Sequence, residues 1–282
     1  IKQIKIAKIG IKVGMKVTEA QYLESYDANQ YYRFSVATDI VAFSVSEEIK
    51  TNYRKLPEKK LRILMIKRGE YPFKGEWALP GGFVRENETT EATARRELEE
   101  ETGVKETYME QLYTFSDPKR DPRTRVISTA YIALLNTNSS LKATEDAVDA
   151  AWFEVNYEQL EGKKYKLILT HEDERLGAER LEADIDGEDF SAQGIAFDHA
   201  KIIAAAIERL RGKIEYTDIA LNLVPERFTL ASLQQVYEII LDKKLLVANF
   251  RRKISELVEE TQEYAENGGH RPSKLYKKAD AR

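Results

Sequence analysis

Residues 81–104 read GGFVRENETTEATARRELEEETGV, and this stretch decides the fold that we expect for the chain. Its fixed spacing of small, acidic and basic residues runs through Gly82, Glu88, Arg96-Glu97-Leu98, Glu100-Glu101 and Gly103-Val104. Seven of these positions are Gly, Glu or Arg. At background frequencies of roughly 7% each, a chance match at one start point is on the order of 10⁻⁸.

The second half of this stretch predicts a helix over residues 90–102. Thr89 suits the N-cap, and Gly103 suits the left-handed residue that ends a helix. At about 100° per residue, three carboxylates fall within an arc of roughly 100°. They are Glu97, Glu100 and Glu101.

Three neighbouring carboxylates on a bare helix repel one another, and a divalent cation would reverse the sign of that interaction. Hard oxygen ligands suit Mg²⁺, or Mn²⁺ in its place, and such ions often bind substrate phosphates as well. The alternative is a solvated acidic helix face. The preceding Pro80-Gly81-Gly82 turn favours the metal site, because it lets the backbone approach a ligand closely.

Residues 82–104 are identified as a Nudix box, the signature of Nudix hydrolases. The resemblance implies an α+β fold, a Nudix α/β/α sandwich. It also implies that the Gly82 carbonyl is a metal ligand and that Arg96 and Glu88 form a structural pair. Glu97, Glu100 and Glu101 would be the metal-binding and catalytic carboxylates, with the general base left open. Such enzymes direct water onto the diphosphate of a nucleoside diphosphate linked to another group.

The composition is that of a globular chain in a reducing compartment. Hydrophobic residues make up 42% and charged residues 33% of the 282 residues, and there is no Cys. No apolar run approaches the ~18 residues that would span a membrane. We therefore expect a cytoplasmic protein without membrane contact. The net charge of −4 argues against indiscriminate nucleic-acid binding by the whole molecule.

Strand-like segments surround the box, and together they define a predicted Nudix domain over residues 31–190. β-branched and aromatic residues predict strands over residues 32–45, 61–67, 109–115, 126–135 and 150–155. Residues 157–160 read as the start of a turn or helix. Residues 165–171 and 181–185 could pair as a hairpin within the acidic linker 161–190. The Lys-rich arm, residues 1–30, reads as a strand or tether, or as a basic arm that touches a partner.

The hydrophobic period changes to that of helices after residue 195. Helices are predicted over residues 197–211, from Thr229, and from Val247 through ANFRRKISELVEE. The tail NGGHRPSKLYKK reads as a turn and a short strand. Three helices and a β-wing predict a winged-helix domain over residues 195–282.

Charge favours nucleic acid as the partner of that domain. Residues 242–254 carry five basic side chains against one acidic, and so do residues 271–282. The start of a recognition helix reaches base edges, and flanking cations hold phosphates. The alternative is a helical subdomain that serves dimerisation.

The whole chain also resembles Nudix-related transcriptional regulators of NAD metabolism and sugar use, and ADP-ribose pyrophosphatase-like proteins with a C-terminal winged helix. The segments IAFDHAKIIAAAIERLR, FTLASLQQVYEIIL, NFRRKI and GGHRPSKLY carry this resemblance. It implies a homodimer on a palindromic operator DNA, controlled by ADP-ribose or a related ligand. The implied DNA contacts are Asn249, Arg251, Arg252 and Lys253 on the helix, and Arg271 and Lys274 on the wing.

Several residues outside the box are candidates for substrate binding. Arg120, Arg123 and Arg125 lie between two predicted strands and could grip a diphosphate, or could form a charged loop with nearby Asp residues. Arg68 closes a strand that leads to the box. We expect Trp77 to pack on the core, and His199 to make a helix-start hydrogen bond or a domain-interface contact.

The sequence thus supports two functions that can coexist. The first is Mg²⁺-assisted hydrolysis of a nucleotide diphosphate, ADP-ribose or a related nucleotide sugar. The second is a winged-helix transcriptional regulator whose Nudix domain senses, or also hydrolyses, an ADP-ribose-like effector.

Overall fold

The computed structural model describes residues 17–48, 58–105, 107–136, 149–173, 176–187, 189–265 and 272–279. The chain divides into two compact units, residues 1–34 and 35–282. Of the expected N-terminal arm, residues 1–16 lie outside the described residues. The rest of the first unit holds the helix α1 (Glu19–Ser25) and the 3₁₀ turn η1 (Ala28–Gln30), neither of which buries a residue.

The second unit is built on a ten-stranded sheet in the order β10-β9-β8-β7-β2-β1-β6-β5, with β3 paired to β2 and β4 to β1. β1 and β6 run parallel, and the other paired strands run antiparallel. The strands are β1 (Ser35–Glu48), β2 (Glu58–Lys67), β3 (Trp77–Ala78), β4 (Gly81–Phe83), β5 (Tyr108–Phe115), β6 (Val126–Leu134), β7 (Asp149–Gln159), β8 (Lys164–Asp173), β9 (Gly177–Asp186) and β10 (Asp189–Gln193).

Most of the predicted strands are confirmed, including the hairpin, in which β8 pairs with β9 and Leu169 lies opposite Leu181. The prediction of a turn or helix at residues 157–160 was wrong, because β7 continues to Gln159. Tyr157 is buried there and stacks on Tyr165 of β8, with ring centroids 5.0 Å apart. Cross-strand packing of this kind outweighs the local sequence preference.

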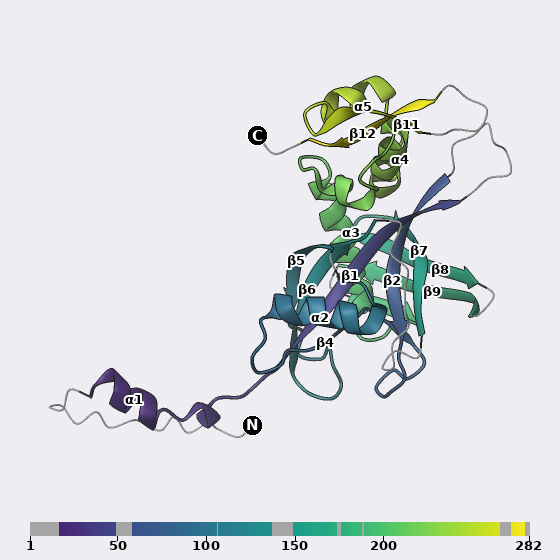
Figure 1. The fold of residues 1–282 in the computed structure, drawn as a ribbon. Helices are drawn as coiled ribbons and strands as arrows, with labels where there is room; N and C mark the ends of the chain where they lie inside the picture. Colours follow the sequence, from purple (N-terminus) through teal and green to yellow (C-terminus); the bar gives the residue numbers. More distant parts are fainter. Residues whose placement is uncertain are drawn as a thin grey trace. The chain divides into compact units, whose positions relative to one another are not determined.

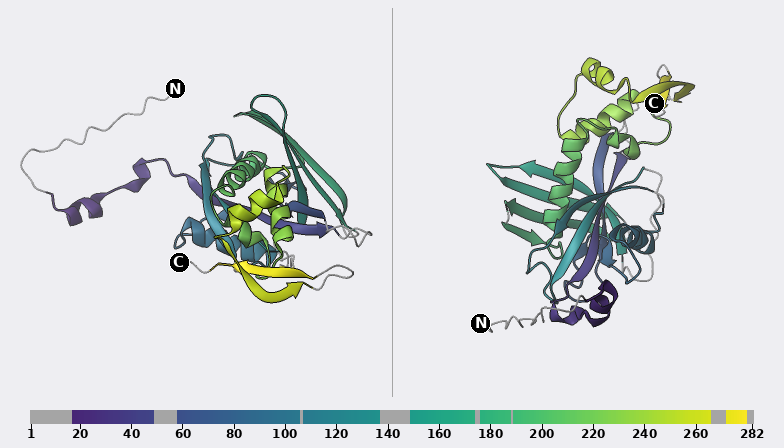
Figure 2. Two further views of the ribbon diagram at one scale, coloured as in Figure 1. Left: turned by 90° about the horizontal axis from the view of Figure 1, so that it is seen from above. Right: turned by 90° about the vertical axis from the view of Figure 1, so that its left-hand side faces the viewer.

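Two helices cover the two faces of the sheet (Figures 1 and 2). α2 (Thr90–Thr102) buries Ala94 and Leu98 in one hydrophobic core. α3 (His199–Lys213) buries an apolar stripe, including Ile203 and Ile207, in the core on the other face. This arrangement confirms the predicted α/β/α sandwich.

The predicted winged helix is also confirmed, with its elements above the sheet in Figure 1. After α3 come η2 (Ile219–Leu223), α4 (Leu230–Leu241), α5 (Val247–Ile254), β11 (Val258–Ala265) and β12 (Ser273–Lys278). Thr229 caps α4 as expected, because its hydroxyl accepts a hydrogen bond from the Ser232 amide at 3.1 Å. No helix among the described residues is long and apolar enough to cross a membrane.

One helix boundary differs from the prediction. The third helix was expected to run to Glu260, but α5 ends at Ile254 and the chain enters β11 at Val258. β11 pairs with β12, and the pairing brings Glu259 within 2.8 Å of Lys277. These non-local contacts outweigh the helix propensity of the Glu-rich segment.

Candidate functional site

The box turn, Leu79–Gly82, brings the main chain against two carboxylates of α2. A Cβ atom on Gly82 would lie 2.2 Å from Glu97 Oε1, so the Gly82 backbone directly faces that carboxylate. The Gly81 amide donates a hydrogen bond of 2.9 Å to Glu101 Oε2. Only glycine permits approaches this close.

The box helix has the ends that the sequence predicts. Thr89 caps its start, with the hydroxyl accepting from the Ala92 amide at 3.1 Å, and Gly103 ends it with a φ of 74°. The carboxylates that the sequence predicts as metal ligands differ in exposure. The side chain of Glu97 is 14% exposed and that of Glu100 is 46% exposed.

Arg96 forms the expected pair with Glu88 and two further ion pairs. Its guanidinium donates to both Glu88 carboxylate oxygens, at 2.7 and 3.0 Å. The hydrogen bonds from Arg96 lower the pKa of Glu88 to about 2. Arg96 Nη1 also donates to Glu97 at 2.7 Å and to Glu100 at 2.8 Å. Arg96 therefore neutralises part of the acidic face as well as tying the loop to the helix.

Glu101 is the carboxylate with the least favourable surroundings. Burial, reinforced by the charges of Glu97 and Asp39, raises the pKa of Glu101 to about 8, against the opposing hydrogen bond from Gly81. A cation placed beside this group would reverse the cost of its ionised form.

The residues at the box turn fit a divalent metal ion. Across the described part of the chain, no group of three or more His, Asp and Glu residues is already arranged to hold a metal ion. The hard oxygen donors nevertheless converge from two elements: the Gly82 backbone faces Glu97, and Gly81 contacts Glu101. Oxygen donors of this kind, with room for waters and phosphate oxygens, are typical of Mg²⁺ sites in proteins.

Two arginines and two aromatic rings lie next to the box turn. The Arg68 guanidinium lies 4.9 Å from the Phe197 ring centroid. Arg123 lies 5.4 Å from the ring of Phe83, the residue after Gly82, and 5.8 Å from Phe197. Burial and then the charge of Arg123 lower the pKa of Arg68, so the two cations are close enough to repel each other. Their proximity favours a bound anion.

The backbone is strained on both sides of this cluster. Phe73 and Phe197 have positive φ angles of 61° and 54°, and their rings meet edge to face with centroids 4.7 Å apart. Left-handed backbone in bulky residues costs free energy and concentrates at functional sites. We therefore assign both residues to the candidate site, although no sequence pattern pointed to either.

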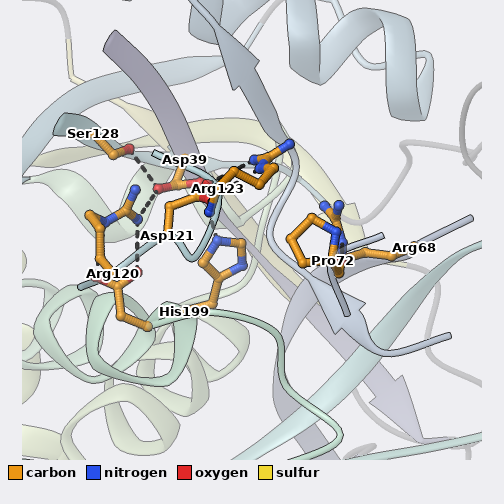
Figure 3. A network of polar contacts seen from close by, with 9 residues as sticks. Asp39, Arg68, Pro72, Arg120, Asp121, Arg123, Ser128 and His199 are labelled. Atoms are coloured by element: carbon orange, nitrogen blue, oxygen red, sulfur yellow. Dashed lines mark hydrogen bonds and ion pairs between the residues drawn. The ribbon is translucent and has the colours of Figure 1, made fainter. Parts of the chain in front are cut away.

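Arg120 lies inside the protein, among groups that the sequence did not connect. Its guanidinium donates to both oxygens of Asp198, at 2.8 and 3.0 Å, and to Asp39 Oδ2 at 3.0 Å (Figure 3). Ser128 Oγ donates to the same Asp39 oxygen at 2.6 Å. Burial raises the pKa of Asp39, but the adjacent His199, Arg120 and Ser128 outweigh it and hold that pKa below its ordinary range.

His199 joins this network to the box turn. Its Nδ1 accepts a hydrogen bond of 2.9 Å from the Leu79 amide, and its Nε2 lies 3.3 Å from Asp39 Oδ1. The sequence predicted that His199 would make a hydrogen bond at the start of a helix, but it did not indicate that the partner is the Leu79 amide. Asp39 did leave a signal, since it is an acidic residue inside an apolar strand, VATDIVAF.

Arg123, beside the box turn, also pairs with Asp121 at 2.8 Å, whereas Arg125 is half-buried at the entrance to β6. Trp77 is 1% exposed and packs on Phe153, with ring centroids 4.8 Å apart, as expected of a core residue.

The candidate DNA-binding residues divide into exposed and internally paired groups. Asn249, Arg251 and Arg252 are exposed on α5. Lys253 contacts Glu215 at 3.0 Å and lies 5.3 Å from the Tyr237 ring centroid. On the wing, Lys274 pairs with Glu260 at 2.6 Å, and Arg271 lies outside the described residues.

Comparison with known families places both parts of the chain. Residues 56–170 match the NUDIX domain, and residues 220–277 match the NrtR DNA-binding winged helix domain. Nudix hydrolases as a class use divalent metal ions.

Individual relatives cover one or both parts. The ADPR responsive transcriptional repressor NtrR of Acinetobacter baylyi is 32% identical over 264 residues, covering 92% of this chain and 88% of the relative. An ADP-ribose pyrophosphatase of Methanocaldococcus jannaschii is 48% identical over 99 residues, covering 35% of this chain and 58% of the relative.

A solved structure extends the likeness to both domains. It is Shewanella oneidensis NrtR complexed with a 27mer DNA, which is 28% identical and superposes with a TM-score of 0.62, covering 86% of this chain and 93% of that one. The chain belongs to the family of Nudix-domain proteins that carry an NrtR-type DNA-binding winged helix.

Proposed function

We propose that this protein hydrolyses the diphosphate of ADP-ribose, or of a closely related nucleotide sugar, with Mg²⁺ bound at the box turn. The observation that carries the proposal is the contact of the Gly81–Gly82 backbone with Glu97 and Glu101, with Arg68 and Arg123 beside it. The similarity to the Methanocaldococcus jannaschii pyrophosphatase supports the choice of substrate.

Each residue of the site has a part in this proposal. Glu97, Glu101 and the Gly82 carbonyl would hold the ion, and Glu100 would join them when Arg96 turns toward Glu88 alone. The bound ion supplies polarisation of phosphoryl oxygens and activation of water. Arg68 and Arg123 would hold the diphosphate by charge-assisted hydrogen bonds, and the Phe197 and Phe83 rings would keep those guanidinium groups in place.

The direct test is the conversion of ADP-ribose and water into AMP and ribose 5-phosphate, followed by chromatography with Mg²⁺, with Mn²⁺ and with a chelator. We expect turnover with either metal and none with the chelator. An absence of both products with each metal, for ADP-ribose and for a panel of nucleotide sugars, would contradict the proposed hydrolysis.

Removing either arginine of the cluster should weaken substrate binding. A charge-assisted hydrogen bond contributes about 1.5–3 kcal/mol, so Arg68→Ala and Arg123→Ala should each raise KM for ADP-ribose by roughly 10- to 100-fold. Initial-rate measurements over a range of substrate concentrations give this number. Lys119→Ala is the matched control, since Lys119 is an exposed cation of the same loop and should leave KM unchanged. Equal KM values for all three variants would refute the assignment.

A second function rests on a separate observation, the exposed cations of α5. We propose that the winged helix binds operator DNA as a homodimer and that ADP-ribose in the Nudix domain controls that binding. The likeness to the repressor of Acinetobacter baylyi and to the DNA-bound NrtR structure supports this proposal. The two activities would divide between a Nudix domain over residues 31–190 and a winged-helix domain over residues 195–282, with α3 packed against both.

Arg251 and Arg252 should carry much of the DNA affinity, because neither has a carboxylate within ion-pair distance among the described residues. A duplex recovered by selection from random sequences provides the probe. We expect Arg251→Ala and Arg252→Ala each to weaken binding by roughly tenfold or more and to lower the salt dependence by about one released ion. Arg95→Ala removes the same charge from the exposed side of α2, and it should leave the DNA affinity unchanged.

A further inference from the structure

Polar contacts clamp the helix α3 at both ends. At its start, Asp198 pairs with Arg120, and His199 faces Asp39, which Arg120 also contacts. Figure 3 shows His199, Asp39 and Arg120 together. The other ring nitrogen of His199 accepts from the Leu79 amide. We call this set the N-terminal clamp. Each of these residues touches or adjoins the candidate site: Leu79 belongs to the box turn, Asp39 pairs with Gly81, and Phe197 directly precedes Asp198.

The other end of α3 is tied to the winged helix. Arg211 donates to the Ile240 carbonyl of α4 at 3.0 Å and to the Tyr157 carbonyl of β7 at 3.2 Å. Glu215, just beyond the helix, contacts Lys243 at 3.0 Å and Lys253 of α5 at 3.0 Å. We call Arg211, Glu215 and these partners the C-terminal clamp.

The hydrogen-bond pattern fixes which ring nitrogen of His199 accepts and which one faces Asp39. The Leu79 amide can only donate, so Nδ1 of His199 must carry no proton. The remaining proton is on Nε2, which faces Asp39. His199 thus connects the box turn and β1 through opposite sides of one ring. Arg120 joins β1 to the start of α3, because its guanidinium contacts both Asp39 and Asp198.

The helix between the clamps is suited to transmit a displacement. Its 15 residues extend over about 22 Å at 1.5 Å per residue, and its apolar stripe is buried along its length. A close-packed helix moves as a unit rather than deforming locally. A shift of the box turn or of Phe197 therefore reaches Glu215, and through Glu215 reaches Lys253 on α5.

We infer that His199 and Arg120 are positioning residues, which hold the box turn for hydrolysis and couple the ligand site through α3 to Glu215 and α5. The inference rests on the proposed function and adds the route by which its two sites interact. It assigns to Arg120 the orientation of the site, in place of the direct contact with substrate that the sequence suggested.

The test compares DNA affinity with and without saturating ADP-ribose, in a chelator that prevents turnover, using the selected duplex as probe. Allosteric ligands typically change affinity by roughly 5- to 150-fold. We expect the ratio of the two DNA dissociation constants, with and without ADP-ribose, to lie in this range for the wild type. In Arg120→Lys and His199→Phe the ratio should fall to within about twofold of 1, because Lys cannot bridge both carboxylates and Phe bonds neither partner. Glu215→Gln should also abolish the ratio, and it should tighten ligand-free DNA binding by releasing Lys253.

Hydrolysis provides a second readout that a merely structural role would not produce. A small misplacement of a reacting group costs up to about 100-fold in rate, so His199→Phe should lower kcat by at least about tenfold with KM nearly unchanged. His199→Asn keeps an acceptor for the Leu79 amide, and it should restore most of kcat. Thermal unfolding of each variant confirms that it is folded.

Arg209→Gln is the matched control, since Arg209 is an exposed cation of α3 whose guanidinium donates to the Leu112 carbonyl of β5 at 3.2 Å rather than to a residue of either clamp. It should keep the wild-type ratio and kcat. Wild-type ratios in folded Arg120→Lys and His199→Phe would overturn the inference while leaving the proposed function intact. A wild-type protein that binds neither DNA nor ADP-ribose would instead refute the proposed function, and the inference with it.

Discussion

Glu101→Gln should almost abolish hydrolysis of ADP-ribose while making the metal-free protein more stable. The substitution removes one of the carboxylates that would hold the metal, and metal ions contribute several kcal/mol of transition-state stabilisation. A loss of about 4 kcal/mol corresponds to roughly a 1000-fold fall in kcat. The fold also loses an acid whose pKa burial raises to about 8. At neutral pH this acid is mostly protonated in the folded state and ionised in the unfolded chain, so folding must take up a proton, and glutamine removes that cost.

The two effects are measured separately, by initial rates with Mg²⁺ and by thermal unfolding in a chelator. We expect Tm to rise by roughly 2–4 °C, which corresponds to about 1 kcal/mol in a chain of this size. Glu99→Gln makes the same chemical change on the same helix at an exposed residue that pairs with Lys105. It should leave the rate unchanged. A Glu101→Gln enzyme with wild-type turnover would remove Glu101 from the metal site.

The two glycines of the box turn should respond to alanine in opposite ways. At Gly81 the added Cβ would lie 2.1 Å from the Thr38 carbonyl oxygen, and the φ of 154° disfavours any side chain. Because a backbone atom of β1 cannot move aside, Gly81→Ala should destabilise the fold by about 3 kcal/mol or more. At Gly82 the added Cβ would meet the carboxylate of Glu97, the end of a flexible side chain.

Gly82→Ala should therefore displace Glu97 with little loss of stability and reduce kcat by roughly 100-fold or more. Denaturant unfolding and initial rates, measured on both variants, separate the two effects. Gly212→Ala is the control for alanine substitution of glycine, because a Cβ at Gly212 meets no atom within 4 Å. If Gly82→Ala were as unstable as Gly81→Ala, the turn would be packed differently from the arrangement described.

The box helix and the winged helix could be predicted because their signals are local. Thr89 and Gly103 mark the ends of α2, and Thr229 marks the start of α4. The end of α5 could not be predicted in this way, because β11 exists through pairing with β12 in a hairpin. The Glu-rich composition of β11 favours a helix, and only the cross-strand contacts with β12 make the segment a strand.

The features of the candidate site also divide into those that follow from local sequence and those that depend on contacts between distant segments. The positions of Glu97 and Glu101 follow from helical spacing, whereas the contact of Gly82 with Glu97 depends on β4 pairing with β1. Arg120 was placed among the substrate ligands because it shares a loop with Arg123. Its burial arises from Asp39 and Asp198, which are 81 and 78 residues away in the chain.

The ion pairs of Arg96 have a consequence for how the protein experiences changes in metal supply. Its guanidinium already balances Glu97 and Glu100, so the acidic face has a resident counter-ion before any metal arrives. Binding of the metal then replaces the Arg96 guanidinium as the cation beside these carboxylates, and it is not required for the protein to fold. If the proposed hydrolysis holds, a protein built this way would keep its shape when the divalent metal is scarce and lose only turnover, so that a bound nucleotide would persist intact until the metal returns.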